Sequence, residues 1–384
     1  MKTKSYRHLS LLLFALCAPD MFSQGPKGLE LERIVSIPVT VTKKDGARVT
    51  GLSAAVFALL EADRNRPVDS VTEVPPLLVG KNKTKVAFVL FDAITSPLRL
   101  QTEIRKDCLQ ALASSAINQA PMSLAEIDRD GLHVVHEVST PYSTLAAALL
   151  ILDGESPFLV ERDQLRAIGS GSNDKSLISA ETERLQKFRR GSIQSSNMMG
   201  RFLSQLKALQ EMATALQRAD GRKTVLWLTG YFPVEVIDVQ DSININSFGI
   251  TSGFPVKSAS IDYQRTIDLL NSAQISVFPA QIVDNQSTTD SWVVLDFSQP
   301  LDRKTMTGLR QFAQSTGGEA MTASDTIGNL IKRAEDLTTS YYLLRFRPEG
   351  AKSDIKWRTL KVQVNGEPVS VKSPNGLFVF SPRK

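Results

Sequence analysis

The stretch Lys85-Val-Ala-Phe-Val-Leu-Phe-Asp92-Ala-Ile-Thr-Ser96 decides the fold class of this chain. Residues 86–91 are all apolar, a pattern typical of a strand that is covered on both faces in a parallel sheet. In such sheets ligands bind beyond the carboxyl ends of the strands. We therefore predict an open α/β domain whose binding edge runs from Asp92 to Ser96.

The segments that follow alternate between helix and strand patterns. Apolar residues at helical spacing predict helices over residues 98–116, 145–152, 198–218, 263–273, 305–315 and 325–337, the last capped by Ser324 or Asp325. Apolar runs predict strands over residues 122–127, 132–138, 223–229 and 275–283. Residues 153–197 contain a Gly/Ser-rich stretch and a polar helical pattern, so we interpret them as an insertion. Residues 234–259 and 284–300 are predicted to be long loops.

Both ends of the chain have β patterns. Residues 34–42 and 68–74 have strand composition, and Asp45-Gly46 is a hairpin signal. Residues 340–347 and 358–365 alternate between apolar and polar, and residues 369–372 and 377–380 follow as short strands. Each β unit alone is small, so we predict that residues 30–76 and 340–381 pack together as a β-sandwich-like unit around the α/β domain of residues 84–338.

Residues 1–24 are predicted to be a signal peptide. Lys2, Lys4 and Arg7 form a basic start, and residues 9–18 form an apolar run that is too short to span a bilayer. Leu16 before Cys17 does not fit a lipobox, so we do not expect a lipoprotein. We expect the protein in the periplasm, in the cell envelope or secreted.

Composition excludes several classes of protein. The 384 residues are 42% hydrophobic and 22% charged, as in globular proteins, and the formal charge is only +5. No basic stripe with interleaved aromatic residues is present, which argues against nucleic-acid binding. Cleavage at residue 24 would leave Cys108 as the only cysteine, so no intramolecular disulfide is expected. No second segment has the length and apolarity of a transmembrane helix.

The order of segments resembles the VWFA-related domain proteins common in Acidobacteria. The resemblance rests on Ile37-Pro-Val-Thr-Val-Thr-Lys-Lys-Asp-Gly46, Val89-Leu-Phe-Asp92, Gly221-Arg-Lys-Thr-Val-Leu-Trp-Leu-Thr-Gly-Tyr-Phe-Pro233, Ser315-Thr-Gly-Gly318 and Ser340-Tyr-Tyr-Leu-Leu-Arg-Phe-Arg-Pro348. It implies a von Willebrand factor A-like (Rossmann-like) domain, with a mostly parallel sheet and helices on both faces. It also implies export, and adhesion or protein binding by analogy with the fold.

The resemblance raises the question of a divalent cation. Many A domains bind one through an Asp-x-Ser-x-Ser loop, a threonine on a second loop and an aspartate on a third. Here Ile94 stands at the middle serine, Ser143 is the best match for the threonine, and Thr229-Gly230 stands where the third acid would be. A residual Mg²⁺ site would have only Asp92, Ser96 and Ser143, too few oxygens and too little charge, so we expect no bound metal.

Other motifs of catalysis or metal binding are absent or incomplete. His133 and His136 are three residues apart on a predicted strand and point to opposite faces. The segment 221–224, Gly-Arg-Lys-Thr, lacks the upstream glycine of a phosphate loop and precedes a strand. The chain has no Gly-x-Ser-x-Gly and no His-Glu-x-x-His.

We therefore expect a non-enzymatic, exported module that binds an unidentified protein partner and carries a degenerate metal site. Its predicted binding edge consists of Asp92, Thr95, Ser96, Ser143, Thr229 and Gly230. The alternative is an uncharacterised extracytoplasmic enzyme, hydrolase-like, with active groups in the loops 153–197 and 234–260.

Overall fold

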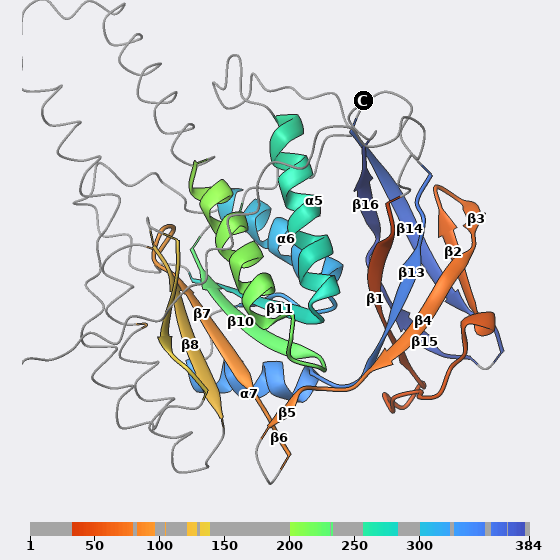
Figure 1. Ribbon diagram of the computed structural model, residues 1–384, viewed down its shortest axis with the longest axis horizontal. Helices are drawn as coiled ribbons and strands as arrows, with labels where there is room; N and C mark the ends of the chain where they lie inside the picture. The colour runs from red at the N-terminus through yellow and green to blue at the C-terminus, as the bar shows by residue number, and fades with distance from the viewer. Residues whose placement is uncertain are drawn as a thin grey trace, which may run out of the picture. The chain divides into compact units, whose positions relative to one another are not determined.

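The apolar stretch 86–91 lies in strand β7 (Ala87–Asp92), near the middle of a six-stranded sheet (Figure 1). The strand order is β12-β11-β10-β7-β8-β9, in which only β9 pairs in the antiparallel sense. The other strands are β8 (Met122–Ile127), β9 (Leu132–His136), β10 (Lys223–Thr229), β11 (Ile275–Gln281) and β12 (Met321–Thr322). The chain is therefore a mixed α/β protein, as the apolar run predicted.

The computed structural model describes residues 33–79, 83–96, 104, 121–128, 131–138, 200–230, 232, 256–282, 300–322, 326–349, 355–366 and 368–380. Several sequence predictions fall outside them: the signal peptide, the helix 145–152, the insertion 153–197 and most of the loops 234–259 and 284–300. Of the helix predicted over 98–116, only Ile104 is described, and it is helical.

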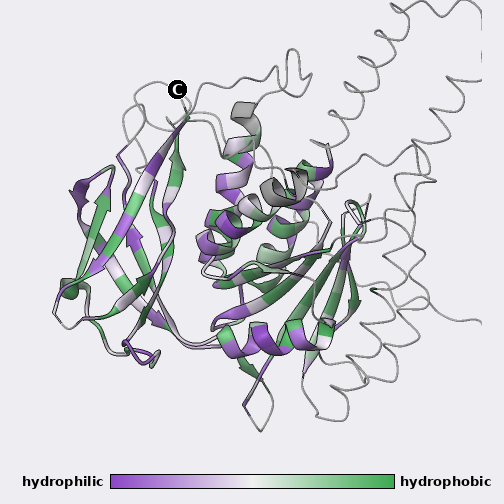
Figure 2. Cartoon of the chain, turned by 180° about the vertical axis from the view of Figure 1, so that it is seen from behind, coloured by the Kyte–Doolittle hydropathy of each residue, from purple (hydrophilic) through white to green (hydrophobic). Residues whose placement is uncertain are grey.

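Helices cover both faces of the six-stranded sheet. One face packs against the helix of residues 200–216, against α5 (Val256–Ser272) and against α6 (Pro300–Ser315), and the other against α7 (Ile327–Leu337). Successive side chains of a strand point to opposite faces of the sheet. Leu90 and Trp227 therefore lie in the hydrophobic core on the first face, whereas Val89 lies in the core on the second face. Figure 2 shows the strands of this sheet mostly in the hydrophobic colour.

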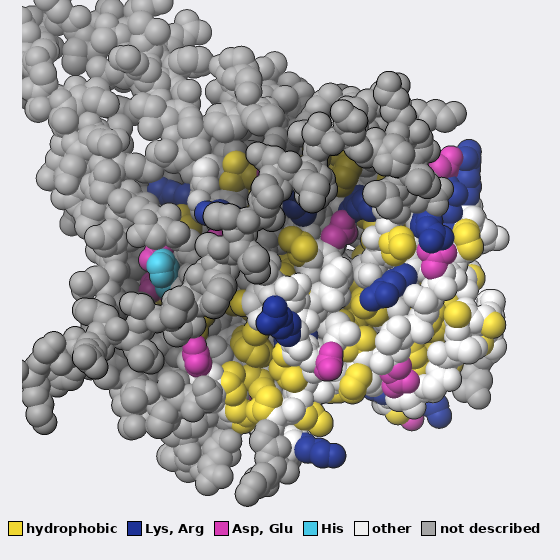
Figure 3. Space-filling model, viewed as in Figure 1, with side chains coloured by type: hydrophobic (Ala, Val, Ile, Leu, Met, Phe, Trp, Pro, Cys, Tyr) yellow, Lys and Arg dark blue, Asp and Glu magenta, His cyan; other side chains and the backbone are white. Residues whose placement is uncertain are grey.

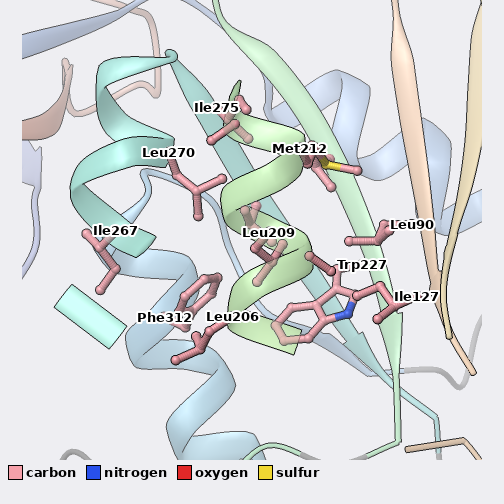
Figure 4. Close-up of a cluster of buried hydrophobic side chains, with 14 of the residues drawn as sticks. Leu90, Ile127, Leu206, Leu209, Met212, Trp227, Ile267, Leu270, Ile275 and Phe312 are labelled. Atoms are coloured by element: carbon pink, nitrogen blue, oxygen red, sulfur yellow. The ribbon is translucent and has the colours of Figure 1, made fainter. Parts of the chain in front are cut away.

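The larger core lies between the sheet and the three helices on its first face. Figure 4 shows Trp227 and Leu90 from the sheet facing Leu206 and Leu209 of the helix 200–216. The Trp227 ring meets the Phe312 ring of α6 at a centroid distance of 5.7 Å, in an edge arrangement that aromatic pairs favour. The helix that carries Leu206 is thus held firmly against the strand that ends at Thr229.

Strands from the two ends of the chain pair with one another in two four-stranded sheets, ordered β15-β1-β13-β4 and β16-β14-β2-β3. Their strands are β1 (Val35–Thr42), β2 (Phe57–Glu61), β3 (Arg64–Arg66), β4 (Val68–Val74), β13 (Tyr341–Phe346), β14 (Lys356–Val364), β15 (Ser370–Lys372) and β16 (Gly376–Val379). One core joins side chains of both sheets, among them Val39, Leu59, Leu344 and Val362. The two sheets therefore form a β-sandwich.

Several element boundaries differ from the sequence predictions. Helix α5 begins at Val256 rather than at residue 263, because Ala259 already packs in the core. Helix α6 begins at Pro300 rather than at residue 305; proline suits a first helical position because it needs no backbone N–H there. Helix α7 is capped by Thr326, whose hydroxyl accepts from the backbone N–H of Asn329 at 3.4 Å, and not by Ser324 or Asp325.

Several short elements were not predicted, among them strand β3. The segment after β4 was predicted to be a linker, but it contains the hairpin β5 (Leu78–Val79) and β6 (Thr84–Lys85). Strand β12 and the 3₁₀ turn η1 (Ala54–Val56) are likewise only two and three residues long. Elements of this length have no room for a periodic pattern.

The surface of the β-sandwich carries Lys and Arg side chains interspersed with Asp and Glu, as Figure 3 shows. One internal group of charges is built around Glu61, whose fully buried carboxylate pairs with Arg66 at 2.7 Å and with Arg358 at 3.1 Å.

Among the described helices, none combines the length and apolarity needed to cross a membrane.

Candidate binding edge at Asp92

The predicted binding edge lies where two neighbouring strands end. Asp92 is the last residue of β7, and Thr229 is the last residue of β10. The strands are parallel and paired, with Phe91 opposite Leu228, so Asp92 and Thr229 come side by side at the carboxyl edge. The turn after β7 brings Thr95 back over both of them.

The Asp92 carboxylate accepts five hydrogen bonds. Its Oδ1 accepts from the backbone N–H groups of Ile94 at 3.0 Å and of Thr95 at 3.2 Å. Its Oδ2 accepts from the Thr95 hydroxyl at 2.7 Å, from the Thr229 hydroxyl at 2.7 Å and from the Gln205 amide at 2.6 Å. The carboxylate therefore braces its own loop and ties it to β10 and to the helix 200–216.

This carboxylate is entirely removed from solvent. Asp92, Thr229 and Gln205 are each 0% exposed. Burial raises the pKa of Asp92, and the hydrogen bonds from Thr95, Gln205 and Thr229 offset part of that rise because they favour the charged form. A carboxylate in this position cannot contact a partner directly, so its effect on the edge is to hold the loop in place.

Gln205 was not among the predicted site residues. It lies on the helix 200–216, three residues after Phe202 and one before Leu206, both of which are buried in the core. It therefore stands on the apolar stripe of an amphipathic helix, where a polar side chain needs a partner. That isolated polar residue was the signal in the sequence that could have found it.

Gly230 allows its backbone to approach the backbone of Thr95 closely. Its backbone N–H donates to the Thr95 hydroxyl oxygen at 3.2 Å. A Cβ atom at this position would lie 2.4 Å from the Thr95 carbonyl oxygen, which is closer than real Cβ contacts. Glycine is thus required here because two backbones meet.

Ile94 and Ser96 complete the turn after β7. Ile94, which stands where a metal-binding serine would be, is 4% exposed and belongs to the larger hydrophobic core. Ser96 is 0% exposed. The turn is therefore anchored by an apolar contact as well as by hydrogen bonds.

The structure brings together Asp92, Thr95, Thr229 and Gly230 of the predicted residues and places Ser96 beside them. Ser143 lies outside the described residues. His133 is on the edge strand β9, where its Nε2 lies 2.9 Å from Oδ1 of Asp128.

The segment 221–224 lies at the opposite, amino-terminal end of β10. Arg222 exchanges backbone hydrogen bonds with Pro75 and Leu77, accepting from the Leu77 N–H at 2.8 Å and donating to the Pro75 carbonyl at 2.7 Å. Gly221 has a φ of +102°, and a Cβ atom there would lie 3.0 Å from Cα of Leu77. This segment therefore joins the α/β part to the segment after β4, which is a structural role.

The residues at this edge do not fit a bound divalent cation. The Gln205 amide nitrogen, a donor that cannot ligate a metal ion, faces the oxygens of Asp92, Thr95 and Thr229. Elsewhere in the part of the chain that the structure describes, no three His, Cys, Asp or Glu side chains gather as a metal site would require.

Comparison with known proteins assigns no family. No family model and no curated protein matches the chain. Among solved structures, the TFIIH p34 N-terminal domain aligns with 65% of this chain and 95% of that domain, at 10% sequence identity and a TM-score of 0.25. The fold and the site thus define a mixed α/β protein with several sheets and a buried, hydrogen-bonded carboxylate at one sheet edge.

Proposed function

We propose that this chain is an exported, non-enzymatic protein-binding module of the von Willebrand factor A type, with adhesion as its functional class. Its binding surface is built on the edge that Asp92, Thr95, Thr229 and Gly230 form. The sequence resemblance supports this class, as does the order of a mostly parallel sheet covered by helices on both faces.

The observation that carries the proposal is the saturation of the Asp92 carboxylate. Five internal donors take up both of its oxygens, and its side chain is fully buried. A group held in this way cannot accept a substrate proton or attack a substrate, since both actions need an accessible atom. It makes the edge rigid, which lowers the entropy cost of binding a partner.

No observation favours the enzyme alternative. His133 is the one histidine whose side chain the structure describes, and it lies on β9 rather than at the Asp92 edge. The loops 153–197 and 234–260, on which that alternative depends, lie outside the described residues except for the first turn of α5.

The test is site-specific photo-cross-linking from two positions at opposite ends of the sheet. Leu203 is 38% exposed on the helical turn that supplies Gln205, at the carboxyl edge of β10. Leu78 is 44% exposed and follows Leu77, which bonds to Arg222 at the amino-terminal end of β10. The two positions are matched in residue type and exposure.

A photoreactive residue in place of Leu203 should capture a protein from the envelope fraction or the culture medium, and the same residue in place of Leu78 should not. Equal capture at both positions, or none at Leu203, would refute the assignment of the binding edge. A screen for ester and peptide hydrolysis by the same preparation addresses the enzyme alternative, and we expect no turnover.

A further inference from the structure

Three oxygens at the Asp92 edge form a triangle of nearly equal sides. Oδ2 of Asp92 lies 2.7 Å from the hydroxyl oxygen of Thr95 and 2.7 Å from that of Thr229, and the two hydroxyl oxygens are 3.1 Å apart. Neighbouring ligands of an octahedral Mg²⁺ ion, with metal–oxygen distances of about 2.1 Å, are roughly 3 Å apart. The triangle therefore has the dimensions of one face of a magnesium octahedron.

The Gln205 amide covers this face. Its Nε2 lies 2.6 Å from Oδ2 of Asp92, 3.2 Å from the Thr229 hydroxyl oxygen and 3.5 Å from that of Thr95. The nitrogen faces the oxygens because a carbonyl oxygen in its place would repel the carboxylate. Its N–H groups thus bring partial positive charge to the place where a cation would bring full charge.

We propose that Gln205 is an internal substitute for a divalent cation, and that the three oxygens beneath it are a preformed cation-binding face closed by this one side chain. The inference does not depend on the proposed function, because it concerns only what holds the edge together. It implies that changing Gln205 alone turns a cation-independent edge into a Mn²⁺- or Mg²⁺-dependent one.

Two substitutions test this with Mn²⁺ as the probe, a divalent ion that accepts carboxylate and hydroxyl ligands. Gln205→Glu replaces the donor by a carboxylate, which supplies a fourth oxygen and a second negative charge. Without a cation, two carboxylates this close cannot both be ionised, so the variant should melt at a lower temperature than the unaltered protein. Gln205→Ala removes the cover and leaves the three oxygens and water.

Gln210→Glu is the matched control. Gln210 lies on the same helix and donates to the hydroxyl of Thr266 at 2.8 Å, so the same chemical change is made against a single hydroxyl. The measurements are melting temperatures in EDTA and in millimolar Mn²⁺, and titration calorimetry with MnCl₂. The full mature chain is used throughout.

We expect Mn²⁺ to raise the melting temperature of Gln205→Glu by about 5 °C at saturation, with one ion bound per chain. Neither the unaltered protein nor Gln210→Glu should respond. A response of Gln205→Glu no larger than that of Gln210→Glu would overturn the proposal.

If Gln205→Glu does not fold in EDTA, refolding that succeeds only with Mn²⁺ supports the same conclusion. If it folds in neither condition, Gln205→Ala decides. Calorimetric binding of Mn²⁺ by Gln205→Ala, absent from the unaltered protein, supports the proposal, and its absence from both overturns it.

Discussion

The guanidinium group of Arg222 lies over the ring of Tyr341, with its central carbon 4.8 Å from the ring centre. Both side chains are buried, Arg222 at 2% and Tyr341 at 3% exposure. The same guanidinium donates to the Ser276 hydroxyl at 2.9 Å, to the Thr339 carbonyl at 2.8 Å and to the Gly317 carbonyl at 2.5 Å. One charged group thus links β11 to the segments that follow α6 and α7 in the chain, and burial lowers its pKa to about 10.

Replacing Arg222 by lysine should destabilise the protein by about 3 kcal/mol. Lysine keeps the charge but has no planar fork, so it cannot serve all three acceptors and stack on the ring at once. Arg310→Lys, at an exposed position of α6, is the control and should change the free energy of unfolding by less than ~0.5 kcal/mol. Urea unfolding followed by circular dichroism measures both. Equal effects of the two changes would contradict the role given to Arg222.

The stabilising contribution of Tyr341 should be lost between pH 10 and pH 12. Burial raises the pKa of Tyr341 from 10.0 to about 12, and the charge of Arg222 opposes part of that rise. The unfolded chain loses the phenol proton first, so the stabilisation is complete below pH 10 and is lost as the pH rises toward 12. The loss amounts to about 3 kcal/mol.

Urea unfolding across this pH range, with Tyr341→Phe as the comparison, measures that slope. The free energy of unfolding of the unaltered protein should fall relative to that of Tyr341→Phe between pH 10 and pH 12. Parallel pH profiles for the two proteins would show that Tyr341 ionises normally.

Gly230→Ala should destabilise the Asp92 edge by roughly 2 kcal/mol or more. The new methyl group would collide with the Thr95 carbonyl, and two backbones would have to separate. Gly200→Ala is the control, since a Cβ atom at that helical position meets nothing within 4 Å. It should be neutral or slightly stabilising. The melting temperature should fall by several degrees in Gly230→Ala and should stay the same or rise slightly in Gly200→Ala. Similar melting temperatures of the two variants would contradict the close contact between Gly230 and Thr95.

Much of the fold could be predicted from the sequence, because the long helices and strands bury apolar residues that recur at a regular spacing. The apolar run that ends at Asp92 became β7, and the alternation around Leu344 and Val362 became β13 and β14. The start of α5 at Val256 was missed, since its first turn has no clear apolar periodicity and Ala259 packs in the core. Packing of this kind has no local signature.

The site could be predicted only in part. The strand ends pointed to Asp92 and Thr229, because the carboxyl ends of parallel strands meet at one edge. The polar Gln205 on the apolar stripe of its helix was a local signal, but its partner Asp92 lies 113 positions away in the chain, and no local pattern encodes that pairing. The sequence showed which metal ligands were missing but not that the Gln205 amide contacts the oxygens of Asp92, Thr95 and Thr229.

Export remains a prediction, and it can be checked directly. The basic start and the short apolar run of residues 9–18 predict a mature N-terminus between about residue 19 and residue 27. N-terminal sequencing of the protein recovered from the envelope or the medium gives the cleavage position. Recovery of the chain from the cytoplasm with Met1 retained would disprove export.

The central claim is that hydrogen bonds, and not a cation, hold the Asp92 edge. The most direct test is the melting temperature of the unaltered protein and of Asp92→Ala, each measured in EDTA and in millimolar MgCl₂. We predict that Asp92→Ala melts at a lower temperature because five side-chain and backbone donors lose their acceptor, and that neither protein responds to Mg²⁺. A melting temperature of the unaltered protein that rises with Mg²⁺, together with an Asp92→Ala protein that does not respond, would contradict the claim.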